Sequence, residues 1–186
     1  TNTGTSSAVV WLQTAAGDGA TNNVIRNCNI SGNASNTTLV GIGSGSSTIA
    51  TNSLGTGNNN NRFENNNIKA VQIGIYSQGA SAANKNTGNI INQNVMNFPT
   101  GSSQNINTAG IFTGFENNIT ISGNTIGSVG GSATDAFGIS CGSINISTST
   151  FTGNEVTDAV ISYNKIDSIR SAGTLSASGI YVVTST

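Results

Sequence analysis

The sequence predicts an all-β solenoid, in which short parallel strands wind into coils that stack on one another. The first observation is a hexad of Ile, two polar or small residues, Asn, one further residue and Ile, seen at residues 121–126. With Cys28, Phe63 or Met96 as single exceptions, it recurs at 25–30, 63–68, 91–96 and 161–166. The second observation is a Gly-Ile pair that follows each hexad. Repeats spaced by about 20–50 residues are typical of stacked repeat architectures.

The composition agrees with such a fold. Only 7% of the 186 residues are charged, and the chain has one Pro and no His. A coil that stacks on its neighbours needs few apolar residues of its own. The low net charge and the regular spacing of Ile and Val argue against disorder, although the remaining sequence is rich in Gly, Ser, Thr and Asn.

Two other fold classes explain the pattern less well. Apolar residues are two, three or five positions apart and are then interrupted by Gly and Asn, so no helical stripe with a period of 3.6 persists. An antiparallel sandwich would suit many short strands separated by turns. It gives no reason, however, for Asn to recur at one place in the hexad.

The chain begins with a strand expected over residues 8–12, which a turn at 16–19 closes. The first hexad then predicts a bent pair of strands around Cys28. A polar segment, 31–38, leads to the first Gly-Ile strand at 40–42. One coil is therefore a bent strand pair, a loop, a Gly-Ile strand and a second loop.

The Gly-Ile strands recur at 73–75, 109–111, 137–139 and 178–180. Because side chains alternate along a strand, we expect the residues on both sides of each Gly to face inward. The spacing of successive Asn positions varies between 28 and 40 residues. This variation predicts a constant core with long inserted loops at 44–61, 97–108, 142–158 and 167–177.

The Asn of the hexad has a predicted structural role. Equivalent residues of stacked parallel strands lie about 4.8 Å apart, and a primary amide both donates and accepts hydrogen bonds. A buried amide left unpaired costs about 1–3 kcal/mol. We therefore predict a ladder, capped by Cys28, of Asn66, Asn94, Asn124 and Asn164. The alternative, that these Asn residues only supply turn conformations, stays open.

With its Ile-x-x-Asn-x-Ile hexads, the chain resembles the right-handed parallel β-helices of the pectin-lyase-like superfamily from Ala8 to Val183. The Gly-Ile strands and Ser/Thr/Asn-rich insertions are similar to surface and secreted proteins of Bacteroidota that the type 9 secretion system exports. The resemblance implies about five coils, uncapped at both ends. It also implies that residues 1–186 form a single segment of a longer solenoid, with neighbouring coils or an export or assembly partner.

The residues offer little for catalysis. The superfamily includes lyases that use Arg or Lys with calcium-binding carboxylates, and hydrolases that use paired Asp. Here the seven carboxylates do not recur at equivalent positions. Glu155 and Asp158 are the closest pair, and we interpret them as solvated. Without His there is no triad and no His-ligated metal, and no segment resembles a calcium loop. We therefore assign no catalytic residue, metal or cofactor.

One outward row is a candidate binding surface. One step past each Gly-Ile pair, the predicted register aligns the aromatic residues Trp11, Tyr76, Phe112 and Tyr181. Aromatic faces of this kind can stack on sugar rings or anchor a partner. The alternative is that the inserted loops fold over them as a satellite core. Arg26 and Glu64 also align on the outside, where we expect a surface ion pair.

Charge and cysteines limit the remaining possibilities. A net charge of −1 provides no basic surface for nucleic acid, and no apolar run approaches the roughly 18 residues of a membrane span. Cys28 and Cys141 lie three predicted coils, or about 14 Å, apart. This separation excludes a disulfide and predicts two free, buried thiols.

The expected function is non-catalytic. The sequence favours a structural or adhesive segment of a secreted or cell-surface protein that contacts glycans or a surface. The alternative is part of a polysaccharide lyase or glycosidase whose catalytic coils lie partly outside this segment.

Overall fold

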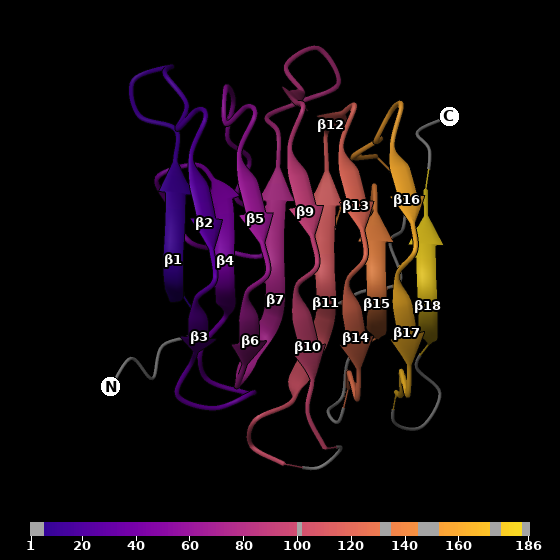
Figure 1. The fold of residues 1–186 in the computed structure, drawn as a ribbon. Coiled ribbons are helices and arrows are strands. Elements are labelled where there is room, and N and C mark those ends of the chain that lie inside the picture. The colour runs from indigo at the N-terminus through magenta and orange to yellow at the C-terminus, as the bar shows by residue number, and fades with distance from the viewer. Residues whose placement is uncertain (1–5, 100–101, 131–134, 145–152, 172–175, 184–186) are drawn as a thin grey trace.

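The computed structural model describes residues 6–99, 102–130, 135–144, 153–171 and 176–183, and these residues form strands and connecting segments without a helix (Figure 1). Sheet A contains, in spatial order, β1 (Ala8–Gln13), β4 (Val40–Gly45), β7 (Val71–Gln78), β11 (Ile106–Gly114), β15 (Ala136–Cys141) and β18 (Ala177–Val182). Sheet B contains β2 (Val24–Arg26), β5 (Arg62–Glu64), β9 (Ile90–Asn92), β13 (Thr120–Ser122) and β16 (Val160–Ser162). Sheet C contains β3 (Asn29–Ser31), β6 (Asn67–Lys69), β10 (Val95–Asn97), β14 (Thr125–Gly127) and β17 (Lys165–Asp167). A small fourth sheet pairs β8 (Asn86–Thr87) with β12 (Glu116–Asn117).

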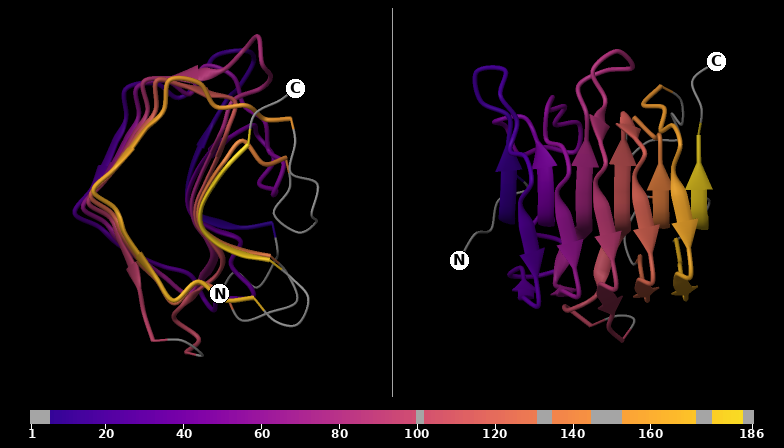
Figure 2. Two further views of the ribbon diagram at one scale, coloured as in Figure 1. Left: turned by 90° about the vertical axis from the view of Figure 1, so that its right-hand side faces the viewer. Right: turned by 45° about the horizontal axis from the view of Figure 1, so that its top comes forward.

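All pairings between these strands are parallel, and the chain visits the sheets in a fixed order. It runs through sheets B, C and A and then returns to sheet B beside the strand it left, so that β2, β3 and β4 are followed by β5, β6 and β7. We call one such round a pass. Seen along the stack, the passes overlie one another (Figure 2). The prediction of an all-β chain with parallel sheets is confirmed, and the arrangement is compatible with a parallel β-helix.

The hexads set the register between the passes. Ile121 of β13 pairs with Ile91 on one side and Ile161 on the other, and Phe63 pairs with Ile25 and Ile91. The apolar positions of successive hexads therefore form continuous inward-facing rows. Together with the Ile of the Gly-Ile strands, they make one inner core whose middle members, including Phe63, Ile91, Ile111 and Ile121, are fully buried.

The Gly-Ile strands bend, so the residues on the two sides of each Gly do not both face inward, contrary to the prediction from the sequence. Ile111 belongs to the inner core, whereas Ala109, on the other side of Gly110, packs in a second cluster on the outer face of sheet A. A Cβ atom on Gly110 would lie 2.6 Å from Ile126 Cγ2, inside the core, and 2.7 Å from the Gly138 carbonyl oxygen. Two consecutive residues thus face inward, and Gly is required because the backbone approaches both neighbours too closely for a side chain.

The position of a pass in the stack decides how well its core residues are covered. Ile42, Ile75, Ile111 and Ile139 are fully buried, but Ile180, at the same position in β18, is 49% exposed. No described strand lies over the outer edge of β18. Cys28 shows the same effect at the other end, since it is exposed and not buried as predicted. Cys141, in β15, is buried, and both thiols are free.

Candidate functional site: two amide columns and the Glu116 cluster

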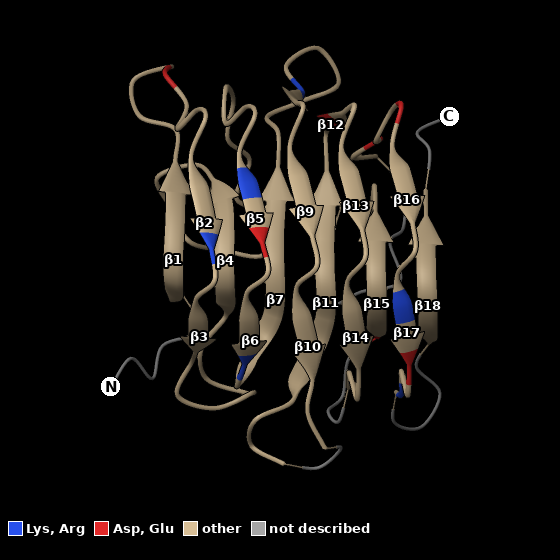
Figure 3. Cartoon of the chain, viewed as in Figure 1, with Lys and Arg blue, Asp and Glu red and all other residues tan. Residues whose placement is uncertain are grey.

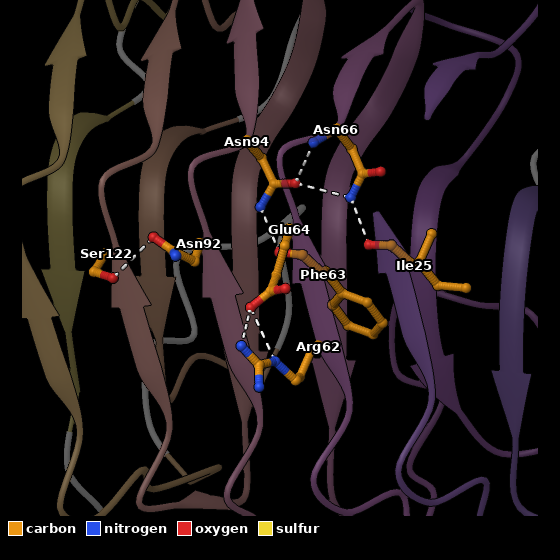
Figure 4. A network of polar contacts seen from close by, with 8 residues as sticks. All are labelled: Ile25, Arg62, Phe63, Glu64, Asn66, Asn92, Asn94 and Ser122. Carbon is orange, nitrogen blue, oxygen red and sulfur yellow. Dashed lines mark hydrogen bonds and ion pairs between the residues drawn. The ribbon is translucent and has the colours of Figure 1, made fainter. Parts of the chain in front are cut away.

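The first amide column lies at the corner between sheets B and C (Figure 4). The Oδ1 atom of Asn94 accepts hydrogen bonds from the backbone N and from Nδ2 of Asn66, both at 3.0 Å. Asn94 Nδ2 in turn donates to Asn124 Oδ1 at 3.1 Å and to the Phe63 carbonyl oxygen at 2.8 Å. Asn124 contacts Asn164 in the same way. Each amide therefore joins the pass before it to the pass after it.

The turn at this corner is made by a different residue. The residue directly before each column position has a positive φ, and these residues are Asn27, Asn65, Gln93, Gly123 and Tyr163. Asn is among the residues that tolerate this conformation best. The column residues themselves are not among those with positive φ. Turn formation and amide stacking are thus divided between neighbouring residues.

Cys28 occupies the first position of this column without an amide. Its backbone N donates to Asn66 Oδ1 at 3.1 Å, and its Sγ lies 3.2 Å from the Arg26 carbonyl oxygen. Cys28 therefore makes the backbone hydrogen bond of this column but not the side-chain hydrogen bond. This difference distinguishes Cys28 from Asn66, Asn94 and Asn124.

A second amide column, which the sequence analysis missed, lies at the corner before sheet B. Asn61 Oδ1 accepts from the backbone N and from Nδ2 of Asn23, both at 3.0 Å, and Asn89 Oδ1 accepts from the backbone N of Asn61 at 2.8 Å. A signal for it exists in the sequence, because Asn61 and Asn89 each stand five residues before a first-column Asn. At the equivalent place before Asn124 the chain has Ile119, so the amides stop at Asn89.

Glu116 of β12 terminates the second column. Its Oε2 accepts from Asn89 Nδ2 at 2.9 Å, and its Oε1 lies 2.6 Å from the hydroxyl of Ser77 in β7. The side chain is fully buried. Burial raises the pKa of this carboxyl to about 7, and hydrogen bonds from Ser77 and Asn89 oppose the rise.

A row of small polar side chains in sheet A runs beside Glu116. Ser77 pairs in register with Ser44 and Thr113, and Thr113 pairs with Cys141. The Thr113 hydroxyl donates to Cys141 Sγ at 3.4 Å. The pKa of Cys141 is raised to about 11, chiefly by burial, and the nearby Glu116 carboxylate raises it further, whereas the bond from Thr113 lowers it.

The arrangement of this cluster suits a structural role. Its members Ser77, Thr113, Glu116 and Cys141 are all fully buried, so no substrate can reach them in this conformation. Three buried atoms nearby have no hydrogen-bond partner among the described residues: Ser44 Oγ, Gln78 Nε2 and Asn86 Nδ2. The cluster can hold or release a proton, and its polar groups make the corner costly to disturb.

Glu116 is not one of several scattered carboxylates, as the sequence had suggested, because its position relative to the hexads is regular. Asn58, Asn86 and Glu116 each stand eight residues before a first-column Asn. The structure pairs Glu116 with Asn86 in register, and Asn86 Oδ1 accepts from the backbone N of Asn58 at 3.0 Å. Aligning the segments before the hexads would have shown one acid in a row of amides.

The predicted aromatic row is present, but it is not an open binding surface at its centre. Tyr76 stacks on Trp11 and on Phe112 with ring centroids 5.8 Å and 5.9 Å apart. Tyr76 and Phe112 are fully buried, whereas Trp11 and Tyr181 are partly buried. The loop after β4 contacts Trp11 and Tyr76, since Trp11 Nε1 donates to the Ser46 carbonyl oxygen at 2.9 Å and the Tyr76 hydroxyl donates to the Ser53 carbonyl oxygen at 3.0 Å. The exposure expected at Tyr76 and Phe112 is therefore wrong, because both belong to a buried cluster, which the loop covers at Tyr76.

The few charges are scattered over the molecule (Figure 3). Arg26 and Glu64 pair in register as expected, but Glu64 forms its ion pair with Arg62 of its own strand, at 2.7 Å (Figure 4). The expected Arg26–Glu64 pair is replaced because Arg62 lies two residues away on the same face of β5. Glu155, expected to be solvated, forms an ion pair with Lys85 at 2.7 Å.

No metal site, membrane-spanning helix or similar known protein assigns a function to the described residues. Within the described ranges, no group of three or more His, Cys, Asp or Glu side chains could hold a metal ion. The same residues contain no helix that is long and apolar enough to cross a membrane. Comparison with protein-family models, curated proteins and solved structures gave no match.

Proposed function

We propose that this chain is a right-handed parallel β-helix of five coils that serves as a stiff, non-catalytic segment of a secreted or cell-surface protein. The observation that carries the proposal is the first amide column, which links four successive passes through side-chain hydrogen bonds that are buried or partly buried. Neighbouring passes must stay in register to keep these bonds. Resistance to bending and shear between coils is what a stalk or adhesion module requires.

Exposed polar side chains on this segment could bind a glycan or another hydrated surface. The outward positions of sheet C include the exposed amides Asn29, Asn67 and Asn97. Asn29 and Asn67 pair in register, so they lie about 4.8 Å apart and offer adjacent donors and acceptors to a glycan or another hydrated surface. The partly buried Trp11 and Tyr181 lie at the two edges of the aromatic row, where they would contribute apolar contacts.

A binding and turnover assay separates this role from the enzymatic alternative. The segment is incubated with acidic and neutral polysaccharides, and bound glycan, unsaturated products and reducing ends are measured. We expect binding without turnover. Asn67→Asp, which adds a negative charge at an exposed position, should weaken binding to an acidic polysaccharide and leave the melting temperature unchanged. Sustained release of products by the wild-type segment would overturn the proposal in favour of a lyase or glycosidase.

A further inference from the structure

Glu116 is the place where three rows of buried polar side chains meet. Its Oε1 contacts Ser77 in the hydroxyl row of sheet A, and its Oε2 contacts Asn89 at the end of the second amide column. Its own backbone pairs with Asn86 in the small fourth sheet. One carboxyl group therefore connects sheet A to the corner before sheet B.

We propose that Glu116 is a pH-dependent fastening of this corner: it joins β7 to the second amide column, and its ionisation destabilises the corner because the charge is buried without a cation among the described residues. Both carboxyl oxygens already face donors at hydrogen-bond distance. When Glu116 is protonated, its carboxyl O–H can also donate a hydrogen bond to the hydroxyl oxygen of Ser77. The ionised acid places a full negative charge in the same buried site.

No cation compensates that charge in the described part of the chain. The nearest segments carry Lys85, adjacent to Asn86, and Glu155, but these two residues form an ion pair with each other at 2.7 Å. The Cys141 thiol on β15 is the titratable group whose pKa the carboxylate affects, and Ser77, Thr113 and Asn89 are uncharged. A buried carboxylate without a cation is costly and is relieved by protonation.

The direction of the pH effect follows from the two states of the chain. Burial raises the pKa of Glu116 from 4.5 to about 7 in the folded protein, so the folded state keeps its proton to a higher pH than the unfolded chain. The stability that this group contributes is fully present below about pH 4.5 and is lost as the pH rises through 7. Over that interval the folding equilibrium constant falls by roughly two orders of magnitude. The inference does not depend on the proposed function.

Direct titration tests the proton itself. The chain has three Glu residues, Glu64, Glu116 and Glu155, and carboxyl carbon NMR of labelled Glu resolves them, with Glu116→Gln supplying the assignment. We expect a midpoint near 7 for Glu116. Ser77→Ala should move it higher, because the Ser77 hydrogen bond lowers the pKa. An ordinary midpoint near 4.5 in the folded wild type would refute the proposal.

Stability measurements test the fastening. Urea unfolding is followed at pH 5 and pH 8 for the wild type, for Glu116→Gln and for the surface control Glu64→Gln. From pH 5 to pH 8, the folding equilibrium constant of the wild type and of the control should fall by a factor at least ten times larger than that of Glu116→Gln. The same pH dependence in all three proteins would overturn the proposal.

Thiol labelling tests whether the loosening is local to this corner. In a Cys28→Ser background only Cys141 can react, and it is fully buried, so labelling reports opening of the cluster. After correction for thiol ionisation, the rate should rise between pH 6 and pH 8 with Glu116 present and stay constant with Glu116→Gln. Equal corrected rates would show that ionisation does not open this corner.

Discussion

The two corners that flank sheet B are built from the same local arrangement, but it recurs in more passes at one corner than at the other. At both, a residue with positive φ precedes an inward-facing amide, as Asn65 precedes Asn66 and Asn60 precedes Asn61. The first column continues through Asn164. The second has amides at Asn23, Asn61 and Asn89 and is then interrupted at Ile119.

The difference shows what a column of identical amides achieves. An interior Asn such as Asn94 accepts from the Asn of one neighbouring pass and donates to the Asn of the other and to a backbone carbonyl, so no other kind of side chain is needed. Where the column is interrupted, the last amide requires a specific partner, and Glu116 supplies it. The uniform corner is insensitive to pH, whereas the mixed corner contains a buried acid.

The largest effect is expected for Asn94→Leu, in the middle of the uniform column. The change leaves the Asn66 amide and the Phe63 carbonyl without their partners in a fully buried site. We expect a loss of about 3 kcal/mol or more in the free energy of unfolding. Urea unfolding measures it. The control Asn67→Leu, at an exposed amide whose bond to Asn29 is 3.4 Å long, should cost less than about 1 kcal/mol, and equal losses would contradict the column.

A smaller effect is expected for Asn61→Leu in the interrupted column. This substitution removes the acceptor for Asn23 and the donor to the Ala20 carbonyl oxygen at 2.7 Å. Asn23 and Ala20 are only partly buried, so water can replace part of what is lost. We expect a loss of about 1–2 kcal/mol by the same urea measurement. A loss as large as that of Asn94→Leu would show that the two columns are equally important.

The smallest effect, and a stabilising one, is expected for Cys28→Asn. The backbone bond from residue 28 to Asn66 Oδ1 is already present, and the new amide adds a side-chain donor to the same oxygen. Because the position is exposed, the gain should be about 0.5 kcal/mol, measured as a rise in the unfolding midpoint. Cys28→Ser, which is too short to reach Asn66 in the same way, should give no gain. A gain of the same size for both substitutions would mean that removing the thiol is what matters.

The hexads predicted much of the fold because their information is local and repeated. Ile121, Ile91 and Ile161 occupy equivalent places in the sequence, and they occupy equivalent places in the stack. The inward position of Asn94 follows from the same spacing. Residues such as Asn61 and Glu116 lie outside the apolar hexads that predict the strands, although their spacing from Asn66 and Asn124 is regular.

Other features do not follow from the repeat. Tyr76 faces outward as alternation requires, yet it is buried because the loop containing Ser53 folds over it. Arg62, and not Arg26, pairs with Glu64. Neither the path of a loop nor the choice between two nearby cations is encoded in strand periodicity.

The sequence by itself determined the strands, their parallel stacking and the inward rows, since a repeated pattern of apolar residues and Asn has one register that turns every hexad inward. Only the tertiary structure decided which of these residues are covered and what surrounds each polar group. Burial depends on neighbours that arrive from elsewhere in the chain, and the pKa of a carboxyl depends on that burial. Glu116 is one of seven acidic residues in the sequence, and the fold places it in a buried site that raises its pKa to about 7.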